Sequence, residues 1–113
     1  MRAPALAAAA AMLLGGGTLA GAAEAPQPEL PALVLQSHCD ECHSLSSVRI
    51  GPPFVAVALR YRPAGEAAVE VLARKIIAGG GGNWGVVPMV PNERVSLAEA
   101  RTMARWVLSL QAK

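Results

Sequence analysis

Two cysteines three positions apart, Cys39 and Cys42, are followed directly by His43, and the chain contains no other cysteine. On a helical turn, side chains at positions i and i+3 lie on the same face, so both thiols point the same way. One short segment therefore presents two nucleophilic thiols and one metal-ligating nitrogen. The rest of the chain has to fold around whatever this segment binds.

The Cys-x-x-Cys-His spacing is the pattern by which a c-type haem is attached covalently. Cys39 and Cys42 can form thioethers on one edge of a porphyrin, while His43 places its imidazole under the iron. Three other interpretations remain open. A disulfide of the thioredoxin kind would suit an exported protein, although the expected βαβ pattern is absent. A zinc site would have only His38 to add to its ligands, and the spacing can also occur without a cofactor.

An apolar run from Ala5 to Leu14 follows the single cation Arg2 and leads to the small residues at positions 20–23. This pattern predicts a signal peptide over residues 1–23, with cleavage after Ala22 or Ala23, and hence a periplasmic protein. Retention as a membrane anchor is the alternative. The apolar run is, however, shorter than the ~20 residues that a spanning helix needs.

Residues 24–31 hold three prolines and two glutamates and predict a solvated, Pro-rich leader. Residues 32–113 then form a single domain. A chain of 113 residues that is 53% hydrophobic and 16% charged, with a net charge of +2, is neither a disordered polyelectrolyte nor a typical nucleic-acid-binding protein. A domain of about 90 residues buries little of its own surface, so we expect a cofactor to complete the core.

Helical periodicity and Gly/Pro breaks predict four helices and no sheet, which is an all-α fold. The helices are expected from Ala32 to about His43, over Phe54–Tyr61, over Glu66–Ala78, and from Ser96 to about Leu108. The breaks are Gly51-Pro52-Pro53, Pro63-Ala64-Gly65 and the four glycines 79–82. Ser96 and Glu99 have the spacing of a capping box, which marks the start of the last helix.

Met89 lies in a loop between Pro88 and Pro91, where the backbone has little freedom. A haem iron with one histidine ligand needs a sixth ligand if its task is electron transfer, and a thioether sulfur raises the reduction potential. Met103 is the other candidate, but it falls inside the last helix, where methionine is usually a core residue. We therefore expect His43 and Met89 to be the metal ligands.

The chain resembles a small bacterial class I c-type cytochrome over residues 33–110. The motifs that carry the resemblance are Cys39-x-x-Cys42-His43, Gly51-Pro52, Trp84-Gly85, Pro88-Met89, Asn92 and Trp106-Val107-Leu108. The resemblance implies a cytochrome c fold of about four helices wrapped around one covalently attached haem c. It also implies that Phe54, Tyr61, Met103 and Trp106 wall the haem or join the terminal helices.

Four further residues have roles that the resemblance implies. The carbonyl of Pro52 would accept from the Nδ1 of His43, and Lys75 and Trp84 would approach a haem propionate. The amide of Asn92 would donate to the methionine sulfur. The structural alternatives are a turn residue for Pro52, a solvated cation for Lys75, packing alone for Trp84 and turn chemistry for Asn92.

The resemblance also implies an electron carrier and not an enzyme. With His43 and Met89 bound, no coordination position is left for a substrate. We expect a periplasmic monomer that passes single electrons between respiratory partners, such as a membrane cytochrome complex and a terminal reductase or oxidase. It would bind neither nucleic acid nor a small-molecule substrate. Partners would contact the haem edge beside Val86, Val87 and Val90.

Three other functions stay open. The chain could be the dedicated haem c subunit of a periplasmic dehydrogenase or oxidase. It could be a catalytic or sensing haem protein in which Met89 is weakly held. It could also be a haem-free thiol oxidoreductase that uses Cys39 and Cys42.

Overall fold

The computed structural model describes residues 1, 4, 15, 16 and 30–111. The predicted signal peptide over residues 1–23 and most of the leader over residues 24–31 lie outside this part of the chain, so both stay predictions. In the part that the structure describes, no helix combines the length and hydropathy that crossing a bilayer requires.

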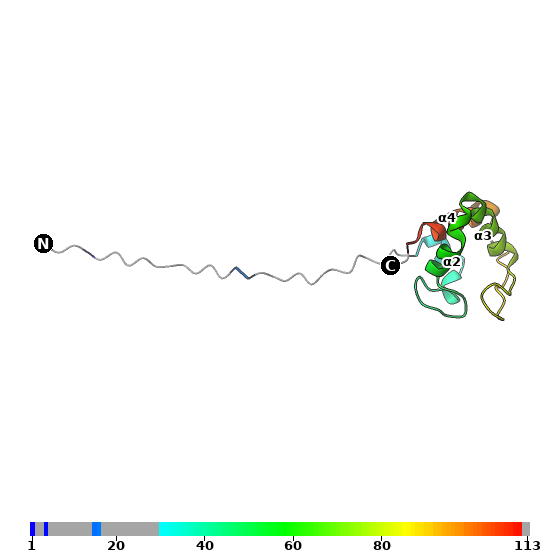
Figure 1. Ribbon diagram of the computed structural model, residues 1–113, viewed down its shortest axis with the longest axis horizontal. Coiled ribbons are helices and arrows are strands. Elements are labelled where there is room, and N and C mark those ends of the chain that lie inside the picture. The colour runs from blue at the N-terminus through cyan, green and yellow to red at the C-terminus, as the bar shows by residue number, and fades with distance from the viewer. Residues whose placement is uncertain (2–3, 5–14, 17–29, 112–113) are drawn as a thin grey trace.

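The described residues form four α-helices and two short 3-10 turns, and they contain no strand (Figure 1). This confirms the all-α prediction. In chain order the elements are α1 (Ala32–Gln36), η1 (Cys39–Glu41), α2 (Phe54–Tyr61), η2 (Arg62–Ala64), α3 (Glu66–Ala78) and α4 (Leu97–Ser109). The second and third helices have the predicted bounds.

The expected first helix, from Ala32 to about His43, is wrong in its extent. The helix ends at Gln36, and His38 takes up a left-handed conformation with φ of 59°. A left-handed residue cannot continue a right-handed helix. The cysteines therefore lie on a separate turn, in which the His43 N–H donates to the Cys39 carbonyl at 2.9 Å.

Small residues allow α3 and α4 to pack closely. Ala68 and Ala73 of α3 and Ala100 and Ala104 of α4 are completely buried, and this is the most extensive contact between helices of the fold. Met103, also on α4, is 3% exposed and lies in the core.

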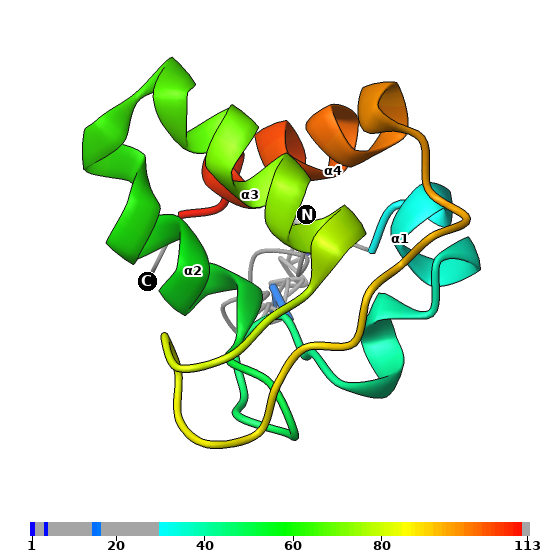
Figure 2. The ribbon, with the colours of Figure 1, turned by 90° about the vertical axis from the view of Figure 1, so that its right-hand side faces the viewer.

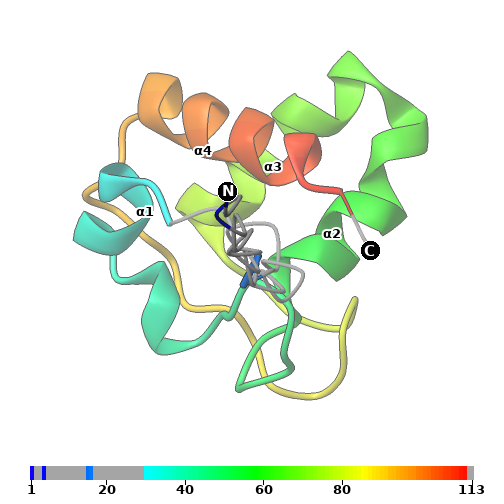
Figure 3. The same ribbon diagram turned by 90° about the vertical axis from the view of Figure 1, so that its left-hand side faces the viewer.

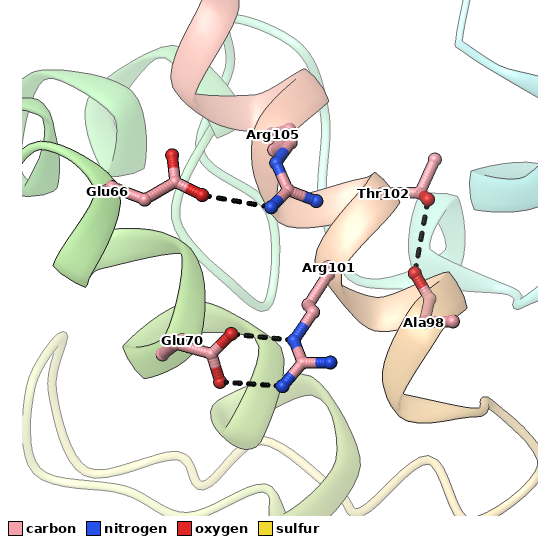
Figure 4. Close-up of polar contacts among 6 residues, drawn as sticks. All are labelled: Glu66, Glu70, Ala98, Arg101, Thr102 and Arg105. Atoms are coloured by element: carbon pink, nitrogen blue, oxygen red, sulfur yellow. Dashed lines mark hydrogen bonds and ion pairs between the residues drawn. The ribbon is translucent and has the colours of Figure 1, made fainter.

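Ion pairs fasten the same two helices on their outer side (Figure 4). Arg101 donates to both carboxylate oxygens of Glu70, at 2.6 and 3.2 Å, and Arg105 donates to Glu66 at 2.9 Å. The bond from Arg101 holds the pKa of the Glu70 carboxyl below its usual range. The two pairs link the helices on a solvated face.

The predicted capping box at the start of α4 is present. The Ser96 hydroxyl accepts from the Glu99 N–H, and a Glu99 carboxylate oxygen accepts from the Ser96 N–H, both at 3.1 Å. Two N–H groups at the helix start are thus satisfied reciprocally. The cap fixes where the chain returns from the loop that carries Met89.

Two loops extend to the same end of the molecule, which is the lower end in Figures 2 and 3. One links Cys42 to α2, and the other runs from Gly79, at the end of α3, to Asn92. Phe54, at the start of α2, joins this end to the core by an edge-to-face contact with Trp106 of α4, with 5.2 Å between the ring centroids. The candidate site lies between these loops and the core.

Candidate haem site

The ring of His43 is held on two sides. Its Nδ1 lies 2.7 Å from the carbonyl oxygen of Pro52, and its ring stacks on Phe54 with centroids 5.1 Å apart and planes inclined by 21°. A carbonyl oxygen only accepts, so Nδ1 carries the proton and Nε2 keeps its lone pair. The contact is the one that the resemblance implies for Pro52, and it leaves Nε2 as the nitrogen for a metal.

Gly51 gives the His43 ring its space. A Cβ atom at this position would lie 2.6 Å from Cε1 of His43, closer than any carbon contact allows. The Gly51 N–H donates to the Cys42 carbonyl at 2.8 Å, which closes the turn between the cysteines and the Pro52 carbonyl. Gly51 therefore serves the close approach of backbone and imidazole.

Cys39 and Cys42 are both half-buried and are not joined to each other. Burial raises the pKa of the Cys39 thiol, and the carboxylate of Asp40 raises it further. Thiol exchange of the thioredoxin kind depends on a lowered thiol pKa. This environment therefore gives no support to the thiol oxidoreductase alternative.

Met89 is fixed through its backbone. Its N–H donates to the Gly80 carbonyl at 2.8 Å, and its own carbonyl accepts from the Gly80 N–H at 2.9 Å. The sequence gives no sign of this isolated β-bridge, because neither residue lies in an alternating pattern. Gly79 makes the pairing possible, since a Cβ atom there would lie 2.4 Å from the Met89 carbonyl oxygen.

The side chain of Asn92 has a partner that was not expected. Its Nδ2 donates to the carbonyl oxygen of Ser37 at 3.0 Å, across 55 positions of the sequence. The Asn92 N–H also bonds to the carbonyls of Ile76 and Ile77, each at 3.2 Å. Asn92 thus ties the end of the Met89 loop to α3 and to the residue that follows α1. Donation to the methionine sulfur stays a prediction.

Trp84 and Lys75 approach the site from two sides. Trp84 is 43% exposed, and the guanidinium of Arg60 lies over its ring, 4.9 Å from the centroid. Lys75 is half-buried in the last turns of α3. A Cβ atom on Gly80 would lie 3.1 Å from its Nζ, so the ammonium group is directed toward the start of the loop.

These residues surround one cavity of about 470 Å³. Its lining includes all eight predicted site residues: Cys39, Cys42, His43, Pro52, Lys75, Trp84, Met89 and Asn92. Apolar side chains complete it, among them Phe54, Val57, Leu72, Ile76, Ala104 and Val107. Met103 is absent from the lining, so its placement in the core agrees with the preference for Met89 as the ligand.

The cavity suits a c-type haem. Its volume falls within the ~300–1,000 Å³ of sites that take cofactor-sized ligands. It offers two thiols, an imidazole with a correctly placed proton, a thioether and an apolar wall. The described residues contain no group of three or more His, Cys, Asp or Glu side chains that could hold a metal ion.

Sequence reasoning missed Arg60, which does not line the cavity but contacts the loop that does. It lies on α2 and reaches the loop by donating to the carbonyl oxygen of Asn83 at 2.6 Å. An exposed arginine on a short helix has no sequence signal that predicts such a contact.

The fold and the cavity define the class of protein: a small all-α protein with a cavity that suits a c-type haem. Comparison with known proteins supports this class. The chain is 51% identical over 72 residues to cytochrome c-551 of Azotobacter vinelandii, a match that spans 63% of this chain and 84% of that protein. It is 41% identical over 99 residues to cytochrome c-551 of Pseudomonas aeruginosa, spanning 87% of this chain and 90% of the other.

A solved structure agrees. The crystal structure of Nitrosomonas europaea cytochrome c552 matches with a TM-score of 0.66 at 37% identity, over 70% of this chain and 96% of that one. No protein-family model matches the chain. The chain belongs to the small class I c-type cytochromes, together with the cytochromes c-551 and c-552. It is thus an electron-carrier cytochrome and not an enzyme, and haem c is the cofactor that its relatives imply.

Proposed function

We propose that the protein is a monomeric periplasmic carrier of single electrons, with haem c bound through Cys39 and Cys42 and ligated by His43 and Met89. One observation carries the proposal: His43 and Met89 line the same cavity from separate loops, and each is fixed by the backbone around it. When bound, the haem supplies one-electron exchange between ferrous and ferric iron.

The chain's own residues prepare this site before any electron moves. Pro52 orients the His43 ring, so that Nε2 is the nitrogen offered to the iron. The Gly80–Met89 pair holds the backbone of Met89. Apolar side chains exclude water, so little solvent has to reorient when the charge of the site changes. Lys75 would neutralise a haem propionate, and Trp84 would donate a hydrogen bond to it.

Electron exchange requires close contact with a partner protein. Three exposed valines beside the cavity could form the surface of this contact. Val86, Val87 and Val90 are 97%, 60% and 72% exposed, and all three are in the cavity lining. Apolar side chains exposed together on a small protein mark a surface of contact with another protein. We infer that respiratory redox partners dock over these valines.

Three measurements test the proposal. Mass analysis of the exported protein should show loss of the first 22 or 23 residues and addition of one haem. The ferrous protein should not bind carbon monoxide at neutral pH, because Met89 would occupy the coordination position that carbon monoxide needs. The isolated protein should exchange electrons rapidly with more than one redox protein.

Two outcomes would contradict the carrier function. Stable co-purification with a single catalytic subunit would favour the haem c subunit of a dehydrogenase or oxidase. Carbon monoxide binding by the parent protein would favour a sensing or catalytic haem.

A further inference from the structure

We propose that Arg60 is a positioning residue that latches the Met89 loop to α2 and thereby keeps Met89 and Trp84 in place. The proposal rests on the proposed function, because Met89 matters in this way only if it is a ligand. Two contacts carry it. Arg60 Nη1 donates to the Asn83 carbonyl oxygen at 2.6 Å, and the guanidinium lies over the Trp84 ring at 4.9 Å.

The segment 81–88 has little else to hold it. Every residue of the segment is exposed, and Gly82 and Gly85 have positive φ angles of 90° and 123°. Among the described residues, the bond from Arg60 to Asn83 is the only hydrogen bond that this segment makes. The segment is thus tied at its ends by the Gly80–Met89 pair, and near its middle by Arg60 alone.

Figure 2 shows the loop, in yellow, leaving the end of α3 and passing below α2. Arg60 bridges these two elements across 23 positions of the sequence. Its guanidinium also lies 5.7 Å from the centroid of the Tyr61 ring, which gives the latch a second aromatic contact on its own helix. The Arg60 guanidinium therefore contacts both the loop and its own helix, α2.

Opening of the segment would reach Met89 directly, because the Met89 N–H pairs with Gly80 at the base of the loop. Loss of one charged hydrogen bond and one exposed cation–π contact should raise the population of the open loop about tenfold. Lysine at this position would keep the charge but not the planar fork of donors. It should therefore restore only part of the closed population.

The test uses the haem-loaded protein with three variants: Arg60→Gln, Arg60→Lys and the control Arg105→Gln. The control removes the same charge from an exposed arginine that makes one hydrogen bond, 2.9 Å to Glu66, away from the loop. Amide hydrogen exchange of Gly80 and Met89 is measured in each. We also follow the pH at which the ferric protein loses the weak far-red band of methionine sulfur on iron.

We expect both amides to exchange about tenfold faster in Arg60→Gln and by an intermediate factor in Arg60→Lys, with no change in Arg105→Gln. The band should be lost at lower pH in Arg60→Gln. Unchanged exchange in Arg60→Gln, or equal acceleration in the control, would overturn the latch. A parent protein without the band would instead overturn ligation by Met89, and the exchange rates would still decide whether Arg60 holds the loop.

Discussion

The backbones of Gly80 and Met89 pair in both directions, through hydrogen bonds of 2.9 and 2.8 Å. This pair closes the loop between α3 and α4 at its base, and it places Met89 on the wall of the cavity that His43 also lines. A thioether is a weak ligand, so under the proposed ligation a fixed backbone would reduce the entropy that is lost when the Met89 sulfur binds iron. The glycines before Met89 would then be part of the proposed ligand site.

Substitution of Gly79 should strongly destabilise the protein. Alanine at this position would adopt φ of 66°, which costs roughly 1–3 kcal/mol, and its Cβ would lie 2.4 Å from the Met89 carbonyl oxygen. Gly65→Ala is the matched control, because Gly65 has φ of 63° but open space around the added Cβ. In guanidinium unfolding of the haem-loaded proteins, Gly79→Ala should lose more unfolding free energy than Gly65→Ala. Equal losses in the two variants would mean that the contact with Met89 is unimportant.

Asn92→Ala should lower the free energy of unfolding by about 1–2 kcal/mol, since it removes the amide that donates to the half-buried Ser37 carbonyl. Asn83→Ala is the control, because only the backbone carbonyl of Asn83 makes a hydrogen bond. The reduction potential of the two variants adds a second test. The Asn92 amide has one more hydrogen to donate. A potential that changes in Asn92→Ala but not in Asn83→Ala would support donation to the methionine sulfur, and no change would exclude it.

The ion pair between Glu70 and Arg101 should make stability depend on pH. The pKa of Glu70 lies below its usual value of 4.5 in the folded protein, because Arg101 donates to its carboxylate. A carboxyl group whose pKa is lower in the folded than in the unfolded protein stabilises the fold at pH values above its unfolded pKa. This stabilisation is lost as the pH falls through the folded pKa. Unfolding free energy should therefore fall as pH drops below about 4.5, and less steeply in Glu70→Gln. The control repeats the Glu70→Gln substitution in a protein that already carries Arg101→Gln. If Glu70→Gln reduced the pH dependence of the unfolding free energy equally there, the ion pair between Glu70 and Arg101 would not be the cause of that dependence.

Local signals predicted much of the fold. The bounds of α2 and α3 follow from prolines and glycines, and the start of α4 follows from Ser96 and Glu99, because these signals act within a few residues. The extent of α1 was mispredicted, since His38 is not a residue type that marks a left-handed position as glycine does. The turn that carries the cysteines therefore had to be seen in the structure.

The candidate haem-binding residues could be predicted from the sequence, but the hydrogen bonds that hold their loops in place could not. Cys39, Cys42 and His43 form a contiguous motif, and Met89 lies between two prolines. By contrast, the bonds from Asn92 to Ser37 and from Arg60 to Asn83 join segments 55 and 23 positions apart. No local pattern encodes such pairs, because tertiary packing alone brings their partners together.

The visible spectrum of the ferric, haem-loaded protein tests the central claim most directly, when it is recorded beside Met89→Leu and Met103→Leu. Met103 is buried in the core, where leucine is a tolerated replacement for methionine. The weak far-red band of methionine sulfur on ferric iron should be present in the parent and in Met103→Leu, and absent in Met89→Leu. A band that survives in Met89→Leu, or a parent that lacks it, would contradict the proposed ligation of the iron by His43 and Met89.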